Sequence, residues 1–313
     1  MPGRAENPVL RESIRILKES GFKVSVLLND RRSSFDLMAR RGSSLLITKA
    51  VEELDEVPEE VSRELKRMAS ALSATSLIIA SRKGGEDIEE DLAYDKMGIW
   101  AVAPATLSKA IRGEGPLVYS KLGRFYVNID GGRLREARER RQLSLGSLAR
   151  LVGVSRRAIY EYERGSMDST LEVAIRMEEV LEQGLAVPIN ILAPAPLNAS
   201  YTHRPGGSLD PLERGVALKF KVMGFKVFHF KRAPFDIIAR GRRSRLLVKV
   251  ARHLDHQFKR RLRVMRSLAD VSDSLSFIVV RDGDSAGEGG VVPYEELERV
   301  RNEDELVSMV SSS

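Results

Sequence analysis

The sequence contains no cysteine among its 313 residues. Disulfide bonds, thiolate metal ligands and thiol nucleophiles are therefore excluded, a pattern typical of proteins in a reducing cytoplasm. Long hydrophobic stretches are also absent, because no apolar run approaches the roughly 18 residues that a membrane-spanning helix needs. The N-terminus, MPGRAENP, is polar and unlike a signal peptide. We expect a cytoplasmic protein that makes no contact with a membrane.

Histidine is scarce, with four residues at positions 203, 229, 253 and 256. His253 and His256 have the spacing of neighbours on one helix face, but the residues around them offer no further metal ligand. The sequence therefore predicts no metal site and no cofactor, and no effector pocket is recognisable in it.

Charge and hydrophobicity describe a folded, basic protein. Hydrophobic residues make up 42% and charged residues 30% of a chain whose formal net charge is +7. A length of 313 residues predicts two or three domains. The positive charge favours a polyanionic partner such as nucleic acid, although a generic basic surface explains it equally well.

Residues 1–128 alternate predicted helices with short apolar strands, which is typical of an α/β domain. Asn7-Pro8 combines a capping side chain with proline at the first helical position and so predicts a helix start. The segment 116–130 predicts a hairpin that turns at residues 121–123. The other predicted elements are helices at 9–20 and 61–72 and strands at 22–28, 35–39, 45–50, 76–80 and 99–103.

Residues 209–313 repeat the pattern of this first domain. Gly224-Phe225-Lys226-Val227 repeats Gly21-Phe22-Lys23-Val24 at an offset of 203 residues. After a deletion of three residues in the next loop, Phe235-Asp236 matches Phe35-Asp36 at an offset of 200. One register with one loop deletion favours a duplicated α/β domain over chance similarity.

Residues 131–165 carry the features of two short helices joined by a tight turn. We expect helices at 144–152 and 155–164, each beginning with a serine cap. A further helix is expected at 169–183. A small residue stands where the two short helices cross, and glycines stand where the chain must turn, at Ala149, Gly153 and Gly165.

The segment LSLGSLARLVGVSRRAIYEYERG, residues 143–165, resembles the helix-turn-helix of the Cro/cI repressor class. The family pattern is matched at Ala149, Gly153, Val154, Ser155, Ile159, Glu163 and Gly165. The whole chain, including GPLVYSKLGRFYVNIDGG ahead of the motif, resembles archaeal transcriptional regulators that carry such a domain in mid-chain. This resemblance implies binding to double-stranded DNA that controls transcription.

The resemblance makes residues 155–164 a recognition helix for the major groove. Arg156 and Arg157 would read bases, because arginine pairs bidentately with guanine, although a phosphate contact is an equal alternative for each. Tyr160 would pack on sugar or on a thymine methyl group, and Arg164 would meet phosphate.

The first helix of the motif departs from the family. Many members begin it with a glutamine that touches a backbone phosphate, whereas this chain has Leu145 followed by Gly146. We expect Arg141 or Gln142 to supply the missing contact. The serine caps complete the predicted DNA-binding set, at Ser144 and Ser155. Upstream arginines would position the module on phosphates, at Arg133, Arg135, Arg138, Arg140 and Arg141.

The two α/β domains resemble the restriction-endonuclease-like, or PD-(D/E)XK, fold, which includes archaeal junction resolvases. In that fold an Asp, a Glu and a Lys converge, and the carboxylates hold a divalent metal. The aspartate and lysine are matched by Asp36 and Lys49 in the first domain and by Asp236 and Lys249 in the second. The glutamate positions hold Ile47 and Leu247, and Glu213 is a candidate for the helix glutamate of the second domain only. We therefore expect degenerate nuclease positions, no catalytic residue and no enzyme activity.

The helices that follow these positions differ in charge, since ELDEVPEEVSREL is acidic and HQFKRRLRVMRSL is basic. The basic helix is a candidate secondary DNA contact through Lys259, Arg260 and Arg261. Alternatively it pairs with the acidic helix, in the same chain or a partner chain. Two unrelated solvated faces are the third possibility.

The expected fold class is a duplicated pair of α/β domains around an all-α helix-turn-helix domain. The expected parts are an α/β domain at 1–128, the helix-turn-helix domain at 129–192, a linker at 193–208 and a second α/β domain at 209–313. The expected function is a sequence-specific transcriptional regulator that acts as a homodimer on near-palindromic DNA. Two alternatives stay open: a structure-specific, metal-dependent nuclease, and an architectural or antitoxin-like DNA-binding protein.

Overall fold

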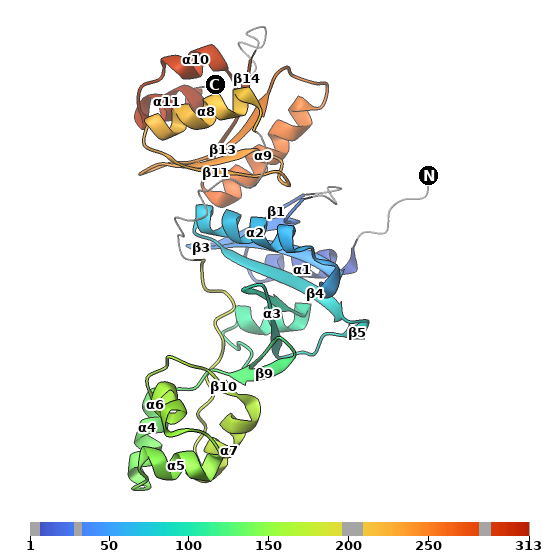
Figure 1. Ribbon diagram of the computed structural model, residues 1–313. Helices are drawn as coiled ribbons and strands as arrows, with labels where there is room; N and C mark the ends of the chain where they lie inside the picture. The colour runs from blue at the N-terminus through green and yellow to red at the C-terminus, as the bar shows by residue number, and fades with distance from the viewer. Residues whose placement is uncertain (1–6, 28–32, 196–208, 282–288, 313) are drawn as a thin grey trace. The chain divides into compact units, whose positions relative to one another are not determined.

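The computed structural model describes residues 7–27, 33–195, 209–281 and 289–312 (Figure 1). The chain divides into two compact units: one contains residues 1–51, 55–77 and 193–313, and the other contains 52–54 and 78–192. Residues 78–128, expected in the first α/β domain, therefore belong to the unit that holds the helix-turn-helix segment. The expected linker at 193–208 lies outside the described residues from position 196 onward.

The N-terminal subdomain of the first unit begins with the predicted cap. The Asn7 side chain accepts hydrogen bonds from the backbone N–H groups of Val9 and Leu10, and Pro8 opens the helix. The strands follow the order β1-β2-β3-β4. The elements are α1 (Pro8–Glu19), β1 (Lys23–Val26), β2 (Leu37–Arg41), β3 (Ser44–Glu53), the 3-10 turn η1 (Leu54–Glu56), α2 (Glu59–Leu72) and β4 (Thr75–Lys83). Residues 52–54 and the part of β4 after Leu77 belong to the second unit.

The C-terminal subdomain of the first unit repeats this order of elements and adds a strand and two helices. Its sheet has the order β11-β12-β13-β14-β15. The first three strands are antiparallel, and β14 and β15 join in parallel. The elements are α8 (Pro211–Val222), β11 (Lys226–His229), β12 (Ile237–Arg240), β13 (Arg245–Ala251), α9 (Phe258–Ser272), β14 (Leu275–Val280), β15 (Val291–Pro293), α10 (Tyr294–Arg299) and α11 (Glu303–Ser312).

Strand register agrees with the offsets read from the sequence. Lys23 pairs with Arg40 in the N-terminal subdomain, and Lys226 pairs with Arg240 in the C-terminal one. The next pairs, Ala39 with Leu46 and Ala239 with Leu246, also correspond at an offset of 200. Equivalent residues therefore occupy equivalent places in the two sheets.

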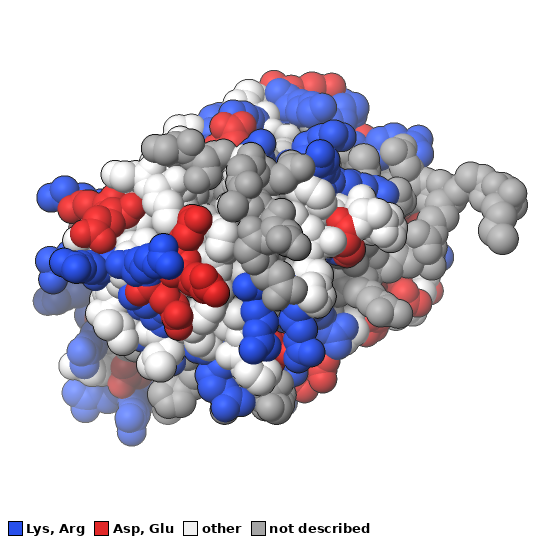
Figure 2. Space-filling view, turned by 90° about the horizontal axis from the view of Figure 1, so that it is seen from above, with Lys and Arg blue, Asp and Glu red and all other residues white. Residues whose placement is uncertain are grey.

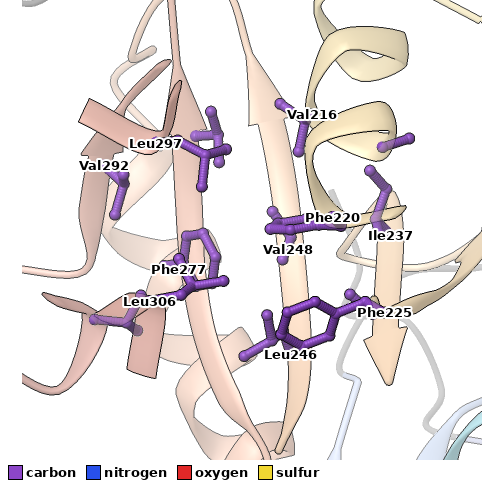
Figure 3. Close-up of a cluster of buried hydrophobic side chains, with 14 of the residues drawn as sticks. Val216, Phe220, Phe225, Ile237, Leu246, Val248, Phe277, Val292, Leu297 and Leu306 are labelled. Atoms are coloured by element: carbon purple, nitrogen blue, oxygen red, sulfur yellow. The ribbon is translucent and has the colours of Figure 1, made fainter. Parts of the chain in front are cut away.

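The C-terminal subdomain has an apolar core between its sheet and the helices α8, α10 and α11 (Figure 3). Phe220 from α8 and Phe277 from β14 meet edge to face with ring centroids 6.5 Å apart. Both rings are fully buried, and each such side chain contributes about 2–3 kcal/mol through removal from water. This core holds β12 and β13, whose connecting turn carries several arginines.

The two subdomains of the first unit contact each other through equivalent elements. Helix α9 packs on β1 and β2, and α2 packs on β11 and β12. Phe35 and Phe235, which correspond in sequence, meet with ring centroids 6.5 Å apart. Such reciprocal contacts are those of an isologous, two-fold interface.

The acidic and basic helices therefore each lie on the strands of the opposite subdomain. The carboxylate of Glu64 on α2 accepts hydrogen bonds from the backbone N–H groups of Lys231 and Arg232, at 2.8 and 2.9 Å. Glu60 forms an ion pair with Arg232 at 2.5 Å. The carboxylates of Glu60 and Glu64 on α2 thus bind the segment before β12.

The second unit joins a small sheet to the helix-turn-helix segment, with the strand order β7-β6-β8-β9-β10. The predicted hairpin is present as β8 and β9, which turn at Leu122 and Gly123. The strands are β5 (Glu86–Asp87), β6 (Leu92–Lys96), β7 (Ile99–Val102), β8 (Val118–Lys121), β9 (Arg124–Val127) and β10 (Ser169–Thr170). The helices are α3 (Pro104–Ile111), α4 (Gly131–Arg140), α5 (Leu145–Val152), α6 (Arg156–Glu163) and α7 (Leu171–Leu181).

The segment 129–192 contains the helices α4 to α7 and strand β10, and the chain after α7 is not helical. This two-residue strand pairs with β9, and Ile129 bridges to Ala186. No helix among the described residues is long and apolar enough to span a membrane.

Candidate nucleic-acid interface

Both helices of the motif begin at the predicted serine caps. The Ser144 hydroxyl accepts a hydrogen bond from the Ser147 backbone N–H at 3.0 Å, and the Ser155 hydroxyl accepts one from Ala158 N–H at 3.1 Å. Each cap satisfies a backbone donor that a helix start leaves without a partner. The two caps set the residues at which α5 and α6 begin.

The turn between the helices depends on Gly153. Its φ of +76° lies in the left-handed region, which side chains with a Cβ avoid. Ala149, Val152 and Ile159 are buried beneath the turn, where α5 and α6 cross. The predicted turn and its apolar contacts are confirmed.

The outward face of α6 carries the predicted reader residues. Arg156 and Arg157 are exposed, and the Arg157 side chain is 87% accessible despite a loose ion pair with Glu161 at 3.7 Å. The Tyr160 ring is 46% exposed and lies beneath the Arg164 guanidinium, 5.5 Å from its centroid. The exposed guanidinium of Arg157 and the Tyr160–Arg164 pair suit contact with base edges and backbone.

Arg138 has a different role from the phosphate contact expected for it. Its guanidinium forms a bidentate ion pair with Glu163 of α6, at 2.5 and 3.1 Å, and donates to the Leu143 carbonyl at 2.9 Å. Only 11% of the Arg138 side chain and 9% of the Glu163 side chain are exposed. The hydrogen bond with Glu163 raises the pKa of Arg138 further, so Arg138 stays charged, and the ion pair joins α4 to α6.

The residues expected to replace the missing glutamine lie at the end of α4. Arg141 donates to the Leu181 carbonyl at 3.2 Å and pairs with Glu182 at 3.0 Å, so it binds the end of α7. Gln142 is exposed and has a φ of +53°. Leu145 packs against the helix-turn-helix core. Among these residues, the exposed side chain of Gln142 is the one without a structural contact in the described chain.

The segment after α6 is hydrogen-bonded to the β8–β9 hairpin. The Tyr119 hydroxyl donates to Asp168 Oδ2 at 2.6 Å, and Ser169 pairs with Val127. Burial, and then the bond to Asp168, raise the pKa of Tyr119 so that it stays protonated and donating. These contacts were not predicted, because nothing in the local sequence links residues 119 and 168.

The degenerate nuclease positions form the same ion pair in both subdomains. Lys49 Nζ lies 2.9 Å from Asp36, and Lys249 Nζ lies 2.7 Å from Asp236. The other carboxylate oxygen of each aspartate accepts a backbone N–H, from Ala50 or Val250, at 2.8 Å. Burial raises the pKa of Asp236, and Lys249 opposes that rise.

The neighbourhood of these pairs is mostly apolar. Ile47 and Leu247, at the positions where the nuclease pattern has glutamate, are completely buried. In the C-terminal subdomain Glu213 instead binds His229, with 2.9 Å between Oε1 and Nδ1. Across the residues that the structure describes, no group of three or more His, Cys, Asp or Glu is arranged to hold a metal ion.

The basic helix α9 places its predicted contact residues at its start. Arg261 pairs with Asp255 at 3.2 Å, and the Lys259 ammonium lies 5.6 Å from the centre of the Phe258 ring. Arg260 is exposed. Figure 2 shows patches of Lys and Arg side chains and patches of Asp and Glu side chains on the face that it draws.

The capped helices, the buried crossing and the exposed basic face of α6 define a helix-turn-helix DNA-binding protein. Residues 134–186 match the family described as helix-turn-helix, and residues 6–116 match the PD-(D/E)XK superfamily domain. The predicted helix-turn-helix is confirmed, and the PD-(D/E)XK resemblance is confirmed for the first α/β domain.

The chain belongs to a family of archaeal HTH-type transcriptional regulatory proteins. It is 34% identical to a "Putative HTH-type transcriptional regulatory protein" of Pyrococcus abyssi, over 95% of this chain and 94% of the relative. Proteins with the same description in Thermococcus kodakarensis and Methanocorpusculum labreanum are also 34% identical, over 94% and 97% of this chain and 92% and 98% of theirs. No solved structure matches the chain.

Proposed function

We propose that the protein is a sequence-specific transcriptional regulator that inserts α6 into the major groove of DNA. The observation that carries this proposal is the exposed face of Arg156, Arg157 and Tyr160 on a helix held by a buried core and a serine cap. Arginine and tyrosine at the start and middle of a recognition helix suit base-edge contacts. The relatives' description as transcriptional regulatory proteins supports the same assignment.

We also propose that it binds as a homodimer in the cytoplasm. Repressors with this motif commonly bind two half-sites about one helical turn apart, and the dimer provides the matching symmetry. Sedimentation of the full chain, alone and with DNA, tests this point. A single chain bound per DNA duplex at saturation would contradict it.

The α/β subdomains act, in this proposal, as duplicated and catalytically inactive relatives of a nuclease fold. Their shared element order, strand register and Asp–Lys pairs support duplication. A site with one carboxylate beside a lysine and a buried aliphatic residue has too few oxygen ligands for a divalent metal. Incubation of the full chain with junction and duplex DNA, with Mg²⁺ or Mn²⁺, should give no cleavage, and metal-dependent cleavage would restore the nuclease alternative.

Mapping the protein on the chromosome of its own cells separates the candidate functions. Enrichment at promoters, lost in an Arg156→Ala/Arg157→Ala variant, is the expected result. Enrichment at junctions or breaks would favour a nuclease, and uniform coverage would favour an architectural DNA-binding protein.

A further inference from the structure

The turns β2–β3 and β12–β13 of the first unit are rich in arginine. The second turn, residues 240–245, reads RGRRSR and contains no acidic residue. We call the arginines at these two turns the arginine surface. It consists of Arg40, Arg41, Arg240, Arg242, Arg243 and Arg245.

Three of these arginines converge where the two subdomains meet. Arg240 and Arg245 are direct cross-strand partners on β12 and β13. Arg245 donates to the Ser272 carbonyl at 3.3 Å, and Arg40, from the other subdomain, donates to the adjacent Val271 carbonyl at 2.6 Å. The end of α9 therefore brings the guanidinium groups of Arg40 and Arg245 side by side.

The positive charges of this group lie at the carbonyl ends of α9 and α2, without a carboxylate partner among the described residues. Arg40, Arg240 and Arg245 bind carbonyl and hydroxyl oxygens, and among the described residues none of the three forms an ion pair with a carboxylate. Like charges directly opposite each other on neighbouring strands destabilise a sheet. Burial lowers the pKa of Arg245, and repulsion by Arg240 and Arg40 lowers it further, while Asp273 opposes the shift.

The β12–β13 turn is held so that its remaining arginines face solvent. Glu303 accepts hydrogen bonds from the backbone N–H groups of Arg242, Arg243 and Ser244, at 2.8–3.0 Å. The carboxylate thus binds the backbone of the turn, and the side chains of Arg242 and Arg243 remain exposed. A rigid turn that presents two arginines loses little conformational entropy when an anion binds.

The N-terminal subdomain indicates that the fold does not require these charges. Leu45 stands where the C-terminal subdomain has Arg245, since each pairs with the equivalent arginine across its hairpin. The N-terminal turn has Gly42 and Ser43 where the other has Arg242 and Arg243. Three of the six arginines, Arg242, Arg243 and Arg245, are therefore present in one subdomain only, and Arg245 is repelled by Arg240 and Arg40.

We propose that the arginine surface binds the phosphate backbone of DNA, as a second contact site separate from the recognition helix. Several guanidinium groups around one place suit phosphate oxygens, because each presents a planar pair of N–H donors. Phosphate binding also relieves the repulsion between the converged arginines. The inference rests on the proposed function only in taking DNA as the ligand.

The test measures the affinity of the full chain for a duplex of unrelated sequence, over a range of salt concentrations. The variant is Arg242→Gln/Arg243→Gln/Arg245→Leu, in which the last change introduces the residue of the N-terminal subdomain. A control variant, Arg63→Gln/Arg252→Gln/Arg281→Gln, removes three exposed charges away from this turn. Arg63 lies on α2, and Arg252 and Arg281 directly follow the C-terminal ends of β13 and β14. Thermal unfolding of each protein checks that the fold is intact. A double variant, Arg242→Gln/Arg243→Gln, leaves the contacts between the subdomains untouched.

The expected result is a shallower salt dependence in the variant, by roughly 2–3 in the slope of log K against log salt, with the control unchanged. The double variant should show part of the loss. Equal losses in variant and control, or no loss in either, would overturn the proposal, as would a loss confined to a Lys259→Gln/Arg260→Gln/Arg261→Gln variant. An Arg156→Ala/Arg157→Ala variant tests the recognition helix separately, because its effect should be on sequence preference.

Discussion

The arginines of the helix-turn-helix segment divide according to the partners of their guanidinium groups. Arg138 is enclosed by Glu163 and a carbonyl oxygen, and Arg141 binds the end of α7. Arg156 and Arg157 project from α6 with little that holds them. The same residue type therefore supports the fold at one position and is available for DNA at another.

Arg157→Ala should weaken binding to the preferred DNA site by roughly 1–3 kcal/mol and relax the preference at the contacted bases. The reason is loss of a bidentate contact to a guanine edge. Affinities for the preferred site and for single-base variants measure this effect. Uniform weakening on every sequence would instead assign Arg157 to the backbone.

The Arg138–Glu163 pair provides a prediction about stability. Glu163→Met should lower the free energy of unfolding by about 2–4 kcal/mol, because it leaves the largely buried Arg138 guanidinium with only the exposed carboxylate of Glu139, at 3.5 Å, as a charge partner. Arg138→Met/Glu163→Met should lose much less, since neither charge is then buried alone. Denaturant unfolding of the two variants checks this. If the double variant is as unstable as the single one, the pair is not coupled as described.

Sequence patterns predict contacts between residues that are close in the chain and miss contacts between residues that are far apart in it. The serine caps, the Gly153 turn and the hairpin at 116–130 depend on residues within a few positions of each other, and the structure confirms them. Arg138 and Glu163 are 25 residues apart, and Arg40 and Val271 are 231 apart. Such partners are set by packing, which the hydrophobic period of a sequence does not specify.

Helices α4 and α6 approach each other closely at Gly131. A Cβ at this position would lie 2.3 Å from the Glu163 carbonyl oxygen, whereas one at Gly146 would lie 3.9 Å from Ser144 Oγ. The start of α4 therefore rests against the end of the recognition helix without room for a side chain.

Gly131→Ala should destabilise the protein by about 1–3 kcal/mol and weaken DNA binding, because α6 must move to relieve the overlap. Gly146→Ala, a matched change inside α5, should be neutral or slightly stabilising owing to the better helix propensity of alanine. Melting temperatures of the two variants test the difference. Equal stability would contradict the close approach.

Helix α11 holds the β12–β13 turn through Glu303, which gives the turn a pH dependence. Burial raises the pKa of Glu303, but hydrogen bonds from Ser244 and from the backbone of residues 242–244 outweigh burial and lower it to about 2. The folded-state pKa lies below the unfolded value near 4.5, so this stabilisation is present above that value and is lost as pH falls toward 2.

Glu303→Gln should reduce the free energy of unfolding at neutral pH by about 1–3 kcal/mol, because an amide nitrogen cannot accept from the turn. The difference between the native protein and this variant should shrink between about pH 4.5 and pH 2. Denaturant unfolding at several pH values measures it. A difference that stays constant over this range would show that the Glu303 charge is not responsible.

At the scale of the whole molecule, one unit contains two α/β subdomains in reciprocal contact and the other contains the helix-turn-helix segment. The repeat at offsets of 203 and 200 residues was readable in the sequence, because it needs no knowledge of contacts. The contacts of Phe35 with Phe235 and of α9 with β1 and β2 could not be predicted from the sequence. An apolar or basic segment of a sequence does not show which other surface it contacts.

The central claim, that α6 reads DNA sequence, is tested most directly by selecting duplexes from a random pool with the full chain. We predict enrichment of a discrete, near-palindromic motif that contains guanine at the positions facing Arg156 and Arg157. The Arg156→Ala/Arg157→Ala variant, matched in fold by thermal unfolding, should lose that enrichment while retaining salt-dependent binding. Selection of no motif by the native chain, or of the same motif with equal strength by the variant, would contradict the account.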